Sequence, residues 1–242
     1  MTHTSPRRLE TLATPRFEGA KACPETPVRA NHGFTLIELM IVLGIGVVLI
    51  ALASVQFEEW REVEAARSAT RSVEGAFSFA RGEAVRTGNN HLVFFQVDIA
   101  GNPLTDGSGN AVPILILDDG RPGSANQNCA IDAGETIQPV RIERGVDFGV
   151  TAATAAAAID GGAGPFATGS SFVDSGGNPA TWVMFRSDGT PRAVDAACTA
   201  GALGTGGGGI YLSNQQRDVA VVLTPLGAAR SQTWSKDSSS WN

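Results

Sequence analysis

One apolar run limits what this chain can fold into. From Phe34 to Phe57 the sequence has 24 residues with a single charged side chain, Glu38, and the stretch from Leu39 to Val55 has no charge at all. An uncharged run of this length is enough to cross a hydrocarbon core of roughly 30 Å as a helix. The sequence therefore predicts one transmembrane helix over 34–57.

The charges on either side of this run differ in sign. Residues 1–33 contain five basic and three acidic side chains, a net charge of +2, and the remaining 13 basic and 21 acidic residues give −8. Basic residues before a span and acidic ones after it, Glu58 and Glu59, place the N-terminus in the cytoplasm and the C-terminal bulk outside. The charge of −8 disfavours nucleic-acid binding over the whole surface, although a local basic patch could still exist.

An ordinary secretory signal peptide is the alternative explanation of the run. Ala51-Leu52-Ala53 before Ser54 has the small-x-small form of a signal peptidase site. Two features argue against it. A carboxylate at Glu38 is costly in a segment that only needs to be apolar, and the cationic region before the run is 33 residues long.

The segment from Gly33 to Met40 resembles the type III signal sequence of type IV pilins and type II secretion pseudopilins. The resemblance implies that a prepilin peptidase cleaves between Gly33 and Phe34 and that the new amine of Phe34 is N-methylated. It also implies that Glu38 pairs with the amine of a neighbouring subunit during filament assembly. A carboxylate inside a span is by default a functional residue, and Gly33 leaves an unhindered backbone for the protease.

The helix is predicted to continue beyond the membrane run. Apolar or small residues recur at a spacing of three and four, which is typical of a helix with one buried face, and Gly88 is a suitable C-cap. A helix over 34–87 would be roughly 80 Å long at 1.5 Å per residue, which resembles the N-terminal spine of a pilin. The residues of the predicted buried stripe are Phe57, Trp60, Val63, Ala66, Ala69, Val73, Ala76, Phe77, Ala80 and Ala84.

After Gly88 the pattern changes to short strands separated by Gly, Asn, Asp and Pro loops. Here the resemblance narrows to the GspH/FimT group of pseudopilins and minor pilins, carried by residues 79–88, 114–119, 132–137, 183–189 and 219–227. It implies an α+β, pilin-like fold in which the long N-terminal helix packs on antiparallel sheet. The predicted divisions are a removed leader (1–33), a transmembrane part (34–57), an amphipathic continuation (58–88) and a β-rich periplasmic domain (89–242). The predicted strands are 91–97, 112–117, 137–143, 182–185, 209–213 and 218–224.

Cysteine usage agrees with export. Cys23 lies in the predicted leader, so the mature chain keeps Cys129 and Cys198. In an oxidising periplasm two remaining thiols are expected to form a disulfide. Two unrelated reduced thiols are the alternative.

The sequence offers little for catalysis. His91 is the only histidine outside the leader, and we expect it at a surface or sheet edge. No zinc or phosphate-loop motif occurs. Asp118, Asp119, Asp132 and Glu135 could ligate Ca²⁺ through oxygen atoms, but adjacent carboxylates at a Gly turn are more often a solvated turn. We therefore expect no enzyme activity, no cofactor and no metal.

Three classes of function remain at this stage. The first is a structural or assembly-initiating minor pilin or pseudopilin, partnered by other pilin subunits, the prepilin peptidase and the inner-membrane assembly platform. The second is a DNA-binding minor pilin in natural transformation. After Gly227 the only basic residues of the sequence are Arg230 and Lys236, which weakens the DNA-binding hypothesis. Arg192, Arg217 and Arg230 could still converge in space to form a basic patch. The third, a membrane-anchored periplasmic enzyme, is disfavoured.

Overall fold

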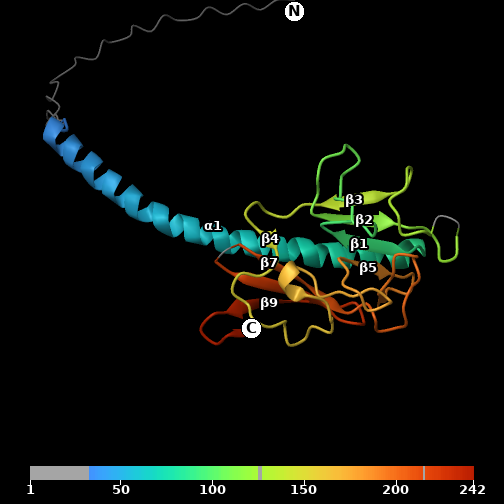
Figure 1. Cartoon of the computed structure of the whole chain (residues 1–242). Coiled ribbons are helices and arrows are strands. Elements are labelled where there is room, and N and C mark those ends of the chain that lie inside the picture. The colour runs from blue at the N-terminus through green and yellow to red at the C-terminus, as the bar shows by residue number, and fades with distance from the viewer. Residues whose placement is uncertain (1–32, 125–126, 215) are drawn as a thin grey trace, which may run out of the picture. The chain divides into compact units, whose positions relative to one another are not determined.

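The computed structural model describes residues 33–242 except 125–126 and 215, and it leaves the side chains of 53–56 and 59 undescribed. One long helix, α1 (Leu36–Thr87), precedes all the strands (Figure 1). The chain divides into a unit that ends at Leu49 and a unit from Ile50 to Asn242. The predictions for the leader and for Cys23 concern residues 1–32, which lie outside the described residues.

Both ends of α1 have a local cause. At the start, the backbone N–H of Glu38 donates to Oγ1 of Thr35 at 3.3 Å, and Thr-x-x-Glu is the sequence of a capping box. At the end, Gly88 adopts a φ of 75° and its N–H donates to the carbonyl of Ala84 at 3.0 Å. A residue with a side chain is strained in that conformation, and glycine is not. The predicted C-cap is thus present.

The first sheet has the order β3-β2-β1-β5-β6, and every pair in it is antiparallel. Its central strand β1 carries the segment His91–Phe95, which is buried along its whole length. The side chains of β1 alternate between two cores, since Val93 and Phe95 belong to the core beneath α1 and Leu92 and Phe94 to a separate core on the outer face. The strands are β1 (His91–Phe95), β2 (Ile114–Asp118), β3 (Ile137–Val140), β5 (Trp182–Phe185) and β6 (Pro191–Arg192).

The second sheet has the order β10-β9-β8-β7-β4 and is also antiparallel. Its two central strands, β7 and β8, are buried throughout, whereas β9 is largely polar. A short 3-10 helix, η1 (Phe166–Thr168), precedes β5. The strands are β4 (Asp147–Phe148), β7 (Gly208–Ser213), β8 (Asp218–Leu223), β9 (Ala229–Ser235) and β10 (Ser240–Trp241).

The second half of α1 packs against both sheets. Its buried residues share one core with apolar side chains of β1, β2 and β5 and of β7 and β8. Phe77 is central, because its ring lies 5.6 Å from that of Phe95, 6.2 Å from that of Phe172 and 6.3 Å from that of Phe185. The predicted α+β fold, an N-terminal helix packed on antiparallel sheets, is confirmed. The buried helix residues are Ala66, Ala69, Val73, Ala76, Phe77, Ala80 and Ala84.

The predicted buried stripe is wrong at its first members. Phe57 is 57% exposed and Trp60 is 60% exposed, and their rings contact each other at 5.8 Å. Contact between α1 and the second sheet is present at the next turn of the helix, where Nδ2 of Asn214 donates to the carbonyl of Glu62 at 2.5 Å.

A single five-residue turn recurs between the strands. In each copy the first N–H donates to the fifth carbonyl and the fourth N–H donates to the first carbonyl, as in a three-residue hairpin loop with a bulge. The fourth residue has positive φ in every copy. In three copies the sequence is Asp-x-x-Gly-Asn, in which the Asp carboxylate accepts N–H bonds from the third and fifth residues. The copies are 98–102, 106–110, 174–178, 186–190, 195–199 and 224–228.

Candidate functional site

The N-terminal motif occupies the start of α1. Gly33 precedes the helix, Phe34 is 82% exposed, and Glu38 is exposed in the first turn. The capping bond to Thr35 comes from the backbone N–H of Glu38. In a capping box the Glu carboxylate also accepts the N–H of the capping residue, a structural role that the sequence analysis did not consider. An acidic residue in the first helical turn is also favoured by the helix dipole. Glu38 therefore has two candidate roles, helix capping and pairing with another subunit.

The apolar side chains that follow are exposed. The large exposed apolar side chains from Phe34 to Leu52 are each at least 56% exposed. In the part of the chain that the structure describes, no helix is both long enough and apolar enough to cross a membrane. The predicted span over 34–57 includes residues 53–56, whose side chains lie outside that part. The exposed side chains are Phe34, Leu36, Ile37, Leu39, Met40, Ile41, Val42, Leu43, Ile45, Val47, Val48, Leu49, Ile50 and Leu52.

Cys129 and Cys198 form a disulfide, as the sequence predicts, with Cα atoms 5.4 Å apart. Cys129 lies in the loop between β2 and β3 and is fully buried, whereas Cys198 is partly exposed in the turn 195–199. Both residues have positive φ, 59° and 60°. The disulfide joins two loops that border the outer core of the first sheet.

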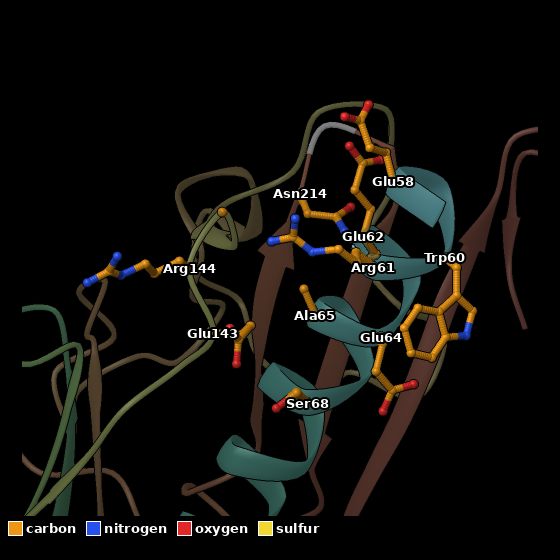
Figure 2. Close-up of a pocket in the computed structure, with 11 residues that line it drawn as sticks. Glu58, Trp60, Arg61, Glu62, Glu64, Ala65, Ser68, Glu143, Arg144 and Asn214 are labelled. Carbon is orange, nitrogen blue, oxygen red and sulfur yellow. Dashed lines mark hydrogen bonds between the residues drawn. The ribbon is translucent and has the colours of Figure 1, made fainter. Parts of the chain in front are cut away.

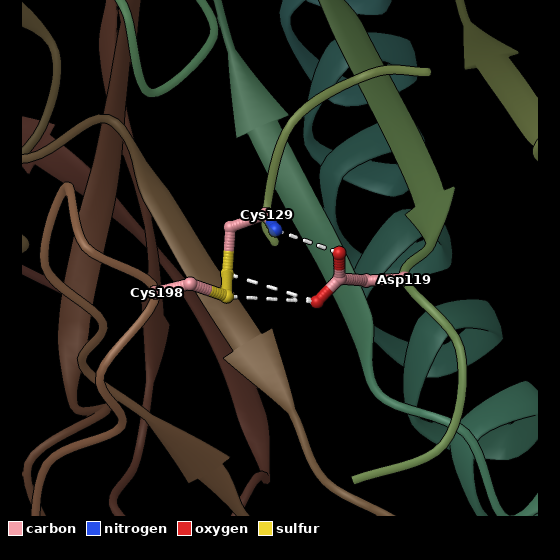
Figure 3. Close-up of side chains that lie close together, drawn as sticks. All are labelled: Asp119, Cys129 and Cys198. Atoms are coloured by element: carbon pink, nitrogen blue, oxygen red, sulfur yellow. Dashed lines mark hydrogen bonds between the residues drawn. A yellow bond between two sulfur atoms is a disulfide. The ribbon is translucent and has the colours of Figure 1, made fainter. Parts of the chain in front are cut away.

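A buried carboxylate lies against this disulfide (Figure 3). Asp119 directly follows β2 and is 0% exposed, and its Oδ2 atom is 3.7 Å from Sγ of Cys129 and 3.7 Å from Sγ of Cys198. Its Oδ1 atom accepts the backbone N–H groups of Cys129 at 2.7 Å and Asn128 at 3.1 Å. One oxygen thus positions the loop, and the other faces both sulfur atoms.

Burial dominates the electrostatics of Asp119. Desolvation raises the pKa of this carboxyl to about 6, the backbone donors Cys129 and Asn128 oppose the rise, and the nearby charges of Glu135 and Asp118 add to it. The pKa of Glu135 is also raised, first by burial. Asp119 is therefore the acid whose charge is least favoured in this region.

The four acidic residues considered for Ca²⁺ are used differently. Asp118 accepts Nδ2 of Asn89 at 2.9 Å, and Asp132 accepts Nδ2 of Asn128 at 2.6 Å. Glu135 accepts the backbone N–H of Asp132 at 2.9 Å. Within the described ranges, the one close group of potential metal donors is Asp119, Cys129 and Cys198, and its sulfur atoms are joined to each other.

The prediction for His91 is wrong. It is 4% exposed in the central strand β1 rather than at an edge, and its Nε2 lies 4.0 Å from Oδ2 of Asp118 across the strand pair. Burial occurs because His91 points to the same face of β1 as Val93 and Phe95, toward α1. No serine or cysteine nucleophile is hydrogen-bonded to it among the residues that the structure describes.

The three arginines considered for DNA do not share one environment. The side chain of Arg192 is 13% exposed and lies 3.8 Å from Asp188, with a further bond from Nη1 to the carbonyl of Gly201 at 3.3 Å. Arg217 and Arg230 are exposed. Arg192 is thus engaged within the fold and is a poor phosphate contact.

A groove of about 600 Å³ lies beside the first turns of α1 in the second unit (Figure 2). Four carboxylates and two guanidinium groups line it, and most of these side chains are exposed. Such a mixture of charges is typical of a solvated surface and does not provide a catalytic set. The lining residues are Glu58, Trp60, Arg61, Glu62, Glu64, Ala65, Ser68, Glu143, Arg144, Gly145 and Asn214.

The comparisons with known proteins concern the N-terminal motif. Residues 28–54 match the prokaryotic N-terminal methylation motif. This range includes Gly33, Phe34 and Glu38 and all of the exposed apolar side chains from Phe34 to Leu52. The motif supports a type IV pilin-like protein. No curated protein and no solved structure was found to match the chain.

Proposed function

We propose that this chain is a minor pilin or pseudopilin of the GspH/FimT kind, a structural or assembly-initiating subunit of a type IV pilus or type II secretion pseudopilus. The observation that carries the proposal is the methylation motif over residues 28–54, with Glu38 in the first turn of a helix whose later part packs on antiparallel sheets. The motif belongs to structural subunits rather than enzymes, which supports a non-enzymatic role.

The exposed apolar segment supports membrane anchoring and filament assembly. Apolar side chains at more than half exposure are unfavourable in water at roughly 25 cal/mol per Å², and contiguous exposed apolar surfaces mark protein or membrane contacts. We assign this segment first to the inner membrane, as a single span with the N-terminus cytoplasmic, and then to the filament interior among other pilin subunits. The negative charge after the run and the disulfide both favour a periplasmic location for the second unit.

In this proposal the prepilin peptidase cuts between Gly33 and Phe34, and the Phe34 amine is then methylated. The carboxylate of Glu38 pairs with the Phe34 amine of a neighbouring subunit. A charge pair in an apolar filament interior is shielded from water, so leaving one partner unpaired costs more than the pair gains.

The test is the intact mass of the protein extracted from membranes. We expect an N-terminus at Phe34 with the added mass of one methyl group. Gly33→Val is the matched control, because a Cβ at Gly33 meets no atom within 4 Å, so the fold stays intact while the protease is obstructed. This variant should retain the leader. A mature N-terminus at Ser54 would instead support the signal peptidase alternative and contradict the proposal.

A further inference from the structure

The contact between Asp119 and the disulfide has chemical consequences. A disulfide sulfur has no proton to donate, so the two 3.7 Å distances to Oδ2 are not hydrogen bonds in the oxidised protein. In the reduced protein each thiol carries a proton, and the same carboxylate oxygen is an acceptor placed beside both sulfur atoms. A general base must lie within reach of the proton that it takes, and such bonds often shorten only in the reacting complex.

We propose that Asp119 is the proton acceptor for closure of the Cys129–Cys198 disulfide by thiol–disulfide exchange. The proposal rests on the geometry of the second unit and is independent of the proposed pilin function. The oxidant is a small or protein disulfide, such as oxidised glutathione. Exchange requires a thiolate, and buried Cys129 is poorly solvated as a thiolate, so a nearby acceptor has its largest effect on this residue.

The exchange proceeds in two balanced steps. The partly exposed Cys198, as a thiolate, attacks oxidised glutathione, forms a mixed disulfide and releases one glutathione thiolate. The Cys129 thiol then passes its proton to Oδ2 of Asp119 while its sulfur attacks Sγ of Cys198. The bond between Cys198 and glutathione breaks, and the second glutathione leaves as a thiolate that is protonated by water. The cysteine pair is oxidised, oxidised glutathione is reduced, and Asp119 later returns its proton to solvent.

The surroundings of Asp119 favour this transfer. The charged groups that face it are acidic, Asp118 from β2 and Glu135 from the loop before β3, and both raise its affinity for a proton. Just before β1, the carbonyl of Asn90 accepts the N–H of Asp119 at 3.0 Å, and the side-chain amide of Asn90 is buried without a hydrogen-bond partner in the described chain. Burial, with smaller contributions from the charges of Glu135 and Asp118, raises the pKa of Asp119 to about 6, which brings it closer to the pKa of a thiol.

The experiment follows the second step in the full chain. Wild type and Asp119→Asn are prepared in detergent with Cys23→Ser in both, so that only two thiols remain whether or not the leader is removed. The reduced proteins are mixed with saturating oxidised glutathione between pH 6 and pH 9, and release of the second glutathione is timed. Asn keeps an oxygen that accepts the loop N–H groups, so the variant preserves the positioning role of Asp119 and removes the proton acceptor.

If Asp119 is the proton acceptor, the pH–rate profiles of wild type and Asp119→Asn should converge or cross at high pH. The wild-type rate should change little between about pH 6.5 and pH 8, because the product of thiol and ionised Asp119 is nearly constant there. The Asp119→Asn rate should rise about tenfold per pH unit with the thiolate fraction. It should be at least about tenfold slower than wild type at pH 6.5, and equal or faster at pH 9, since the variant lacks the charge that disfavours a thiolate.

Parallel profiles would overturn the proposal, since a residue that only holds the loop slows closure by the same factor at every pH. Asp195→Asn is the control, because Asp195 accepts the N–H groups of Ala197 and Thr199 in the Cys198 turn and, in the part of the chain that the structure describes, its carboxylate is not bonded to either sulfur. It should keep the wild-type profile. If Asp119→Asn does not fold, the wild-type profile decides, and a tenfold rise per pH unit from pH 6 upward would contradict the assignment.

Discussion

The two halves of α1 differ in the exposure of their apolar side chains. In the first half Leu43 is 61% exposed, and in the second half Phe77 is 1% exposed. The second half finds its apolar partners in the two sheets of the same chain, whereas the first half is apolar on all sides and its side chains stay uncovered. A helix that is hydrophobic all round belongs inside a larger assembly or a membrane. The difference indicates that the fold of the second half is encoded in this chain and that the environment of the first half is supplied by other molecules.

The carboxylates of the two units differ in the same way as the two halves of α1. Glu38 is exposed near the helix start, whereas Asp119 and Asp218 are fully or almost fully buried in the second unit. The two buried carboxylates have partners within the chain. Asp218 accepts the backbone N–H groups of Thr151, Ala152 and Ala153, which attaches the loop after β4 to β8. At Glu38 the hydrogen bond to Thr35 comes from the backbone N–H and not from the carboxylate.

The largest effect is expected from removing the charge of Glu38. Glu38→Ala should leave cleavage and membrane insertion intact, since a more apolar helix inserts at least as well, and should nearly abolish incorporation into filaments. Leaving the amine of the neighbour unpaired in an apolar setting costs about 3–5 kcal/mol. The measurement is the amount of processed subunit in sheared filaments relative to the membrane fraction.

Two variants separate pairing from helix capping. Glu38→Gln keeps a residue suited to a capping box but removes the charge, so it should be as defective as Glu38→Ala. Thr35→Ala removes the capping oxygen and should cost only about 1 kcal/mol of helix stability, with filaments retained. Normal assembly of Glu38→Gln would show that capping, and not pairing, is the role of Glu38.

A pair of truncations compares the two halves directly. Phe77→Ala should destabilise the second unit by about 3–5 kcal/mol, because it removes a ring packed against three others and leaves a cavity. Leu43→Ala is the matched control, since Leu43 lies on the exposed half of the same helix. It should leave the denaturation midpoint of the second unit unchanged in detergent. An equal loss of stability in Leu43→Ala would show that the first half is packed within the chain.

Much of this fold is readable from the sequence, and the failures have physical causes. The helix, its Gly88 cap and six strands follow from periodicity and turn residues. Strand β9 was missed because Ala229–Ser235 is mostly polar and lacks an alternating apolar pattern, so only its pairing with β8 identifies it. His91 was misplaced because strand order, which makes β1 central, is a long-range property.

The candidate sites show the same limit. The Thr35–Glu38 capping box is visible in the sequence as Thr-x-x-Glu, where it lies within the longer N-terminal motif. The recurring Asp-x-x-Gly-Asn turns were equally visible. The approach of Asp119 to the disulfide was not, because the Cys198 turn is 79 residues from it along the chain and meets it only after the sheet has formed.

The buried carboxylates predict opposite pH dependences for the second unit. The pKa of Asp119 is raised by burial to about 6, so its contribution favours folding below about pH 3.9, the value of an unfolded Asp, and is lost as pH rises to about 6. Asp119→Asn should remove this decline, which is at most about 2–3 kcal/mol. Urea unfolding at intervals from pH 4 to pH 7 measures it, and an unchanged slope would contradict the assignment.

Asp218 should instead make the second unit less stable as the pH falls. Burial raises its pKa, but the backbone N–H groups of Thr151, Ala152 and Ala153 and the hydroxyl of Ser213 together outweigh burial, and the net pKa is lowered. Its contribution is therefore present above the unfolded value and is lost as pH falls through the folded pKa. Asp218→Asn should weaken the second unit at pH 7 and have a smaller effect in acid. Equal losses at both pH values would show that the charge of Asp218 is not what holds the loop.

The smallest effect concerns the backbone at Cys198. This residue occupies the fourth position of the turn 195–199 with a φ of 60°, where the five other copies have glycine at 75–86°. Cys198→Gly and Cys198→Ala both lose the disulfide, which costs up to about 4 kcal/mol on the chain-entropy model. They differ only in backbone freedom, so Cys198→Gly should be the more stable by about 1 kcal/mol.

The turn 174–178 provides the matched comparison. Gly177 has a φ of 85° and a Cβ there would meet no atom within 4 Å, so Gly177→Ala reports the conformational cost alone, with the disulfide intact. If the two turns are equivalent, Gly177→Ala should lose the same 1 kcal/mol or so that separates Cys198→Ala from Cys198→Gly. Denaturant titration of the four proteins measures both differences. Equal stability of Cys198→Gly and Cys198→Ala would mean that the turn relaxes once its sulfur is released, and that the disulfide itself holds Cys198 at positive φ.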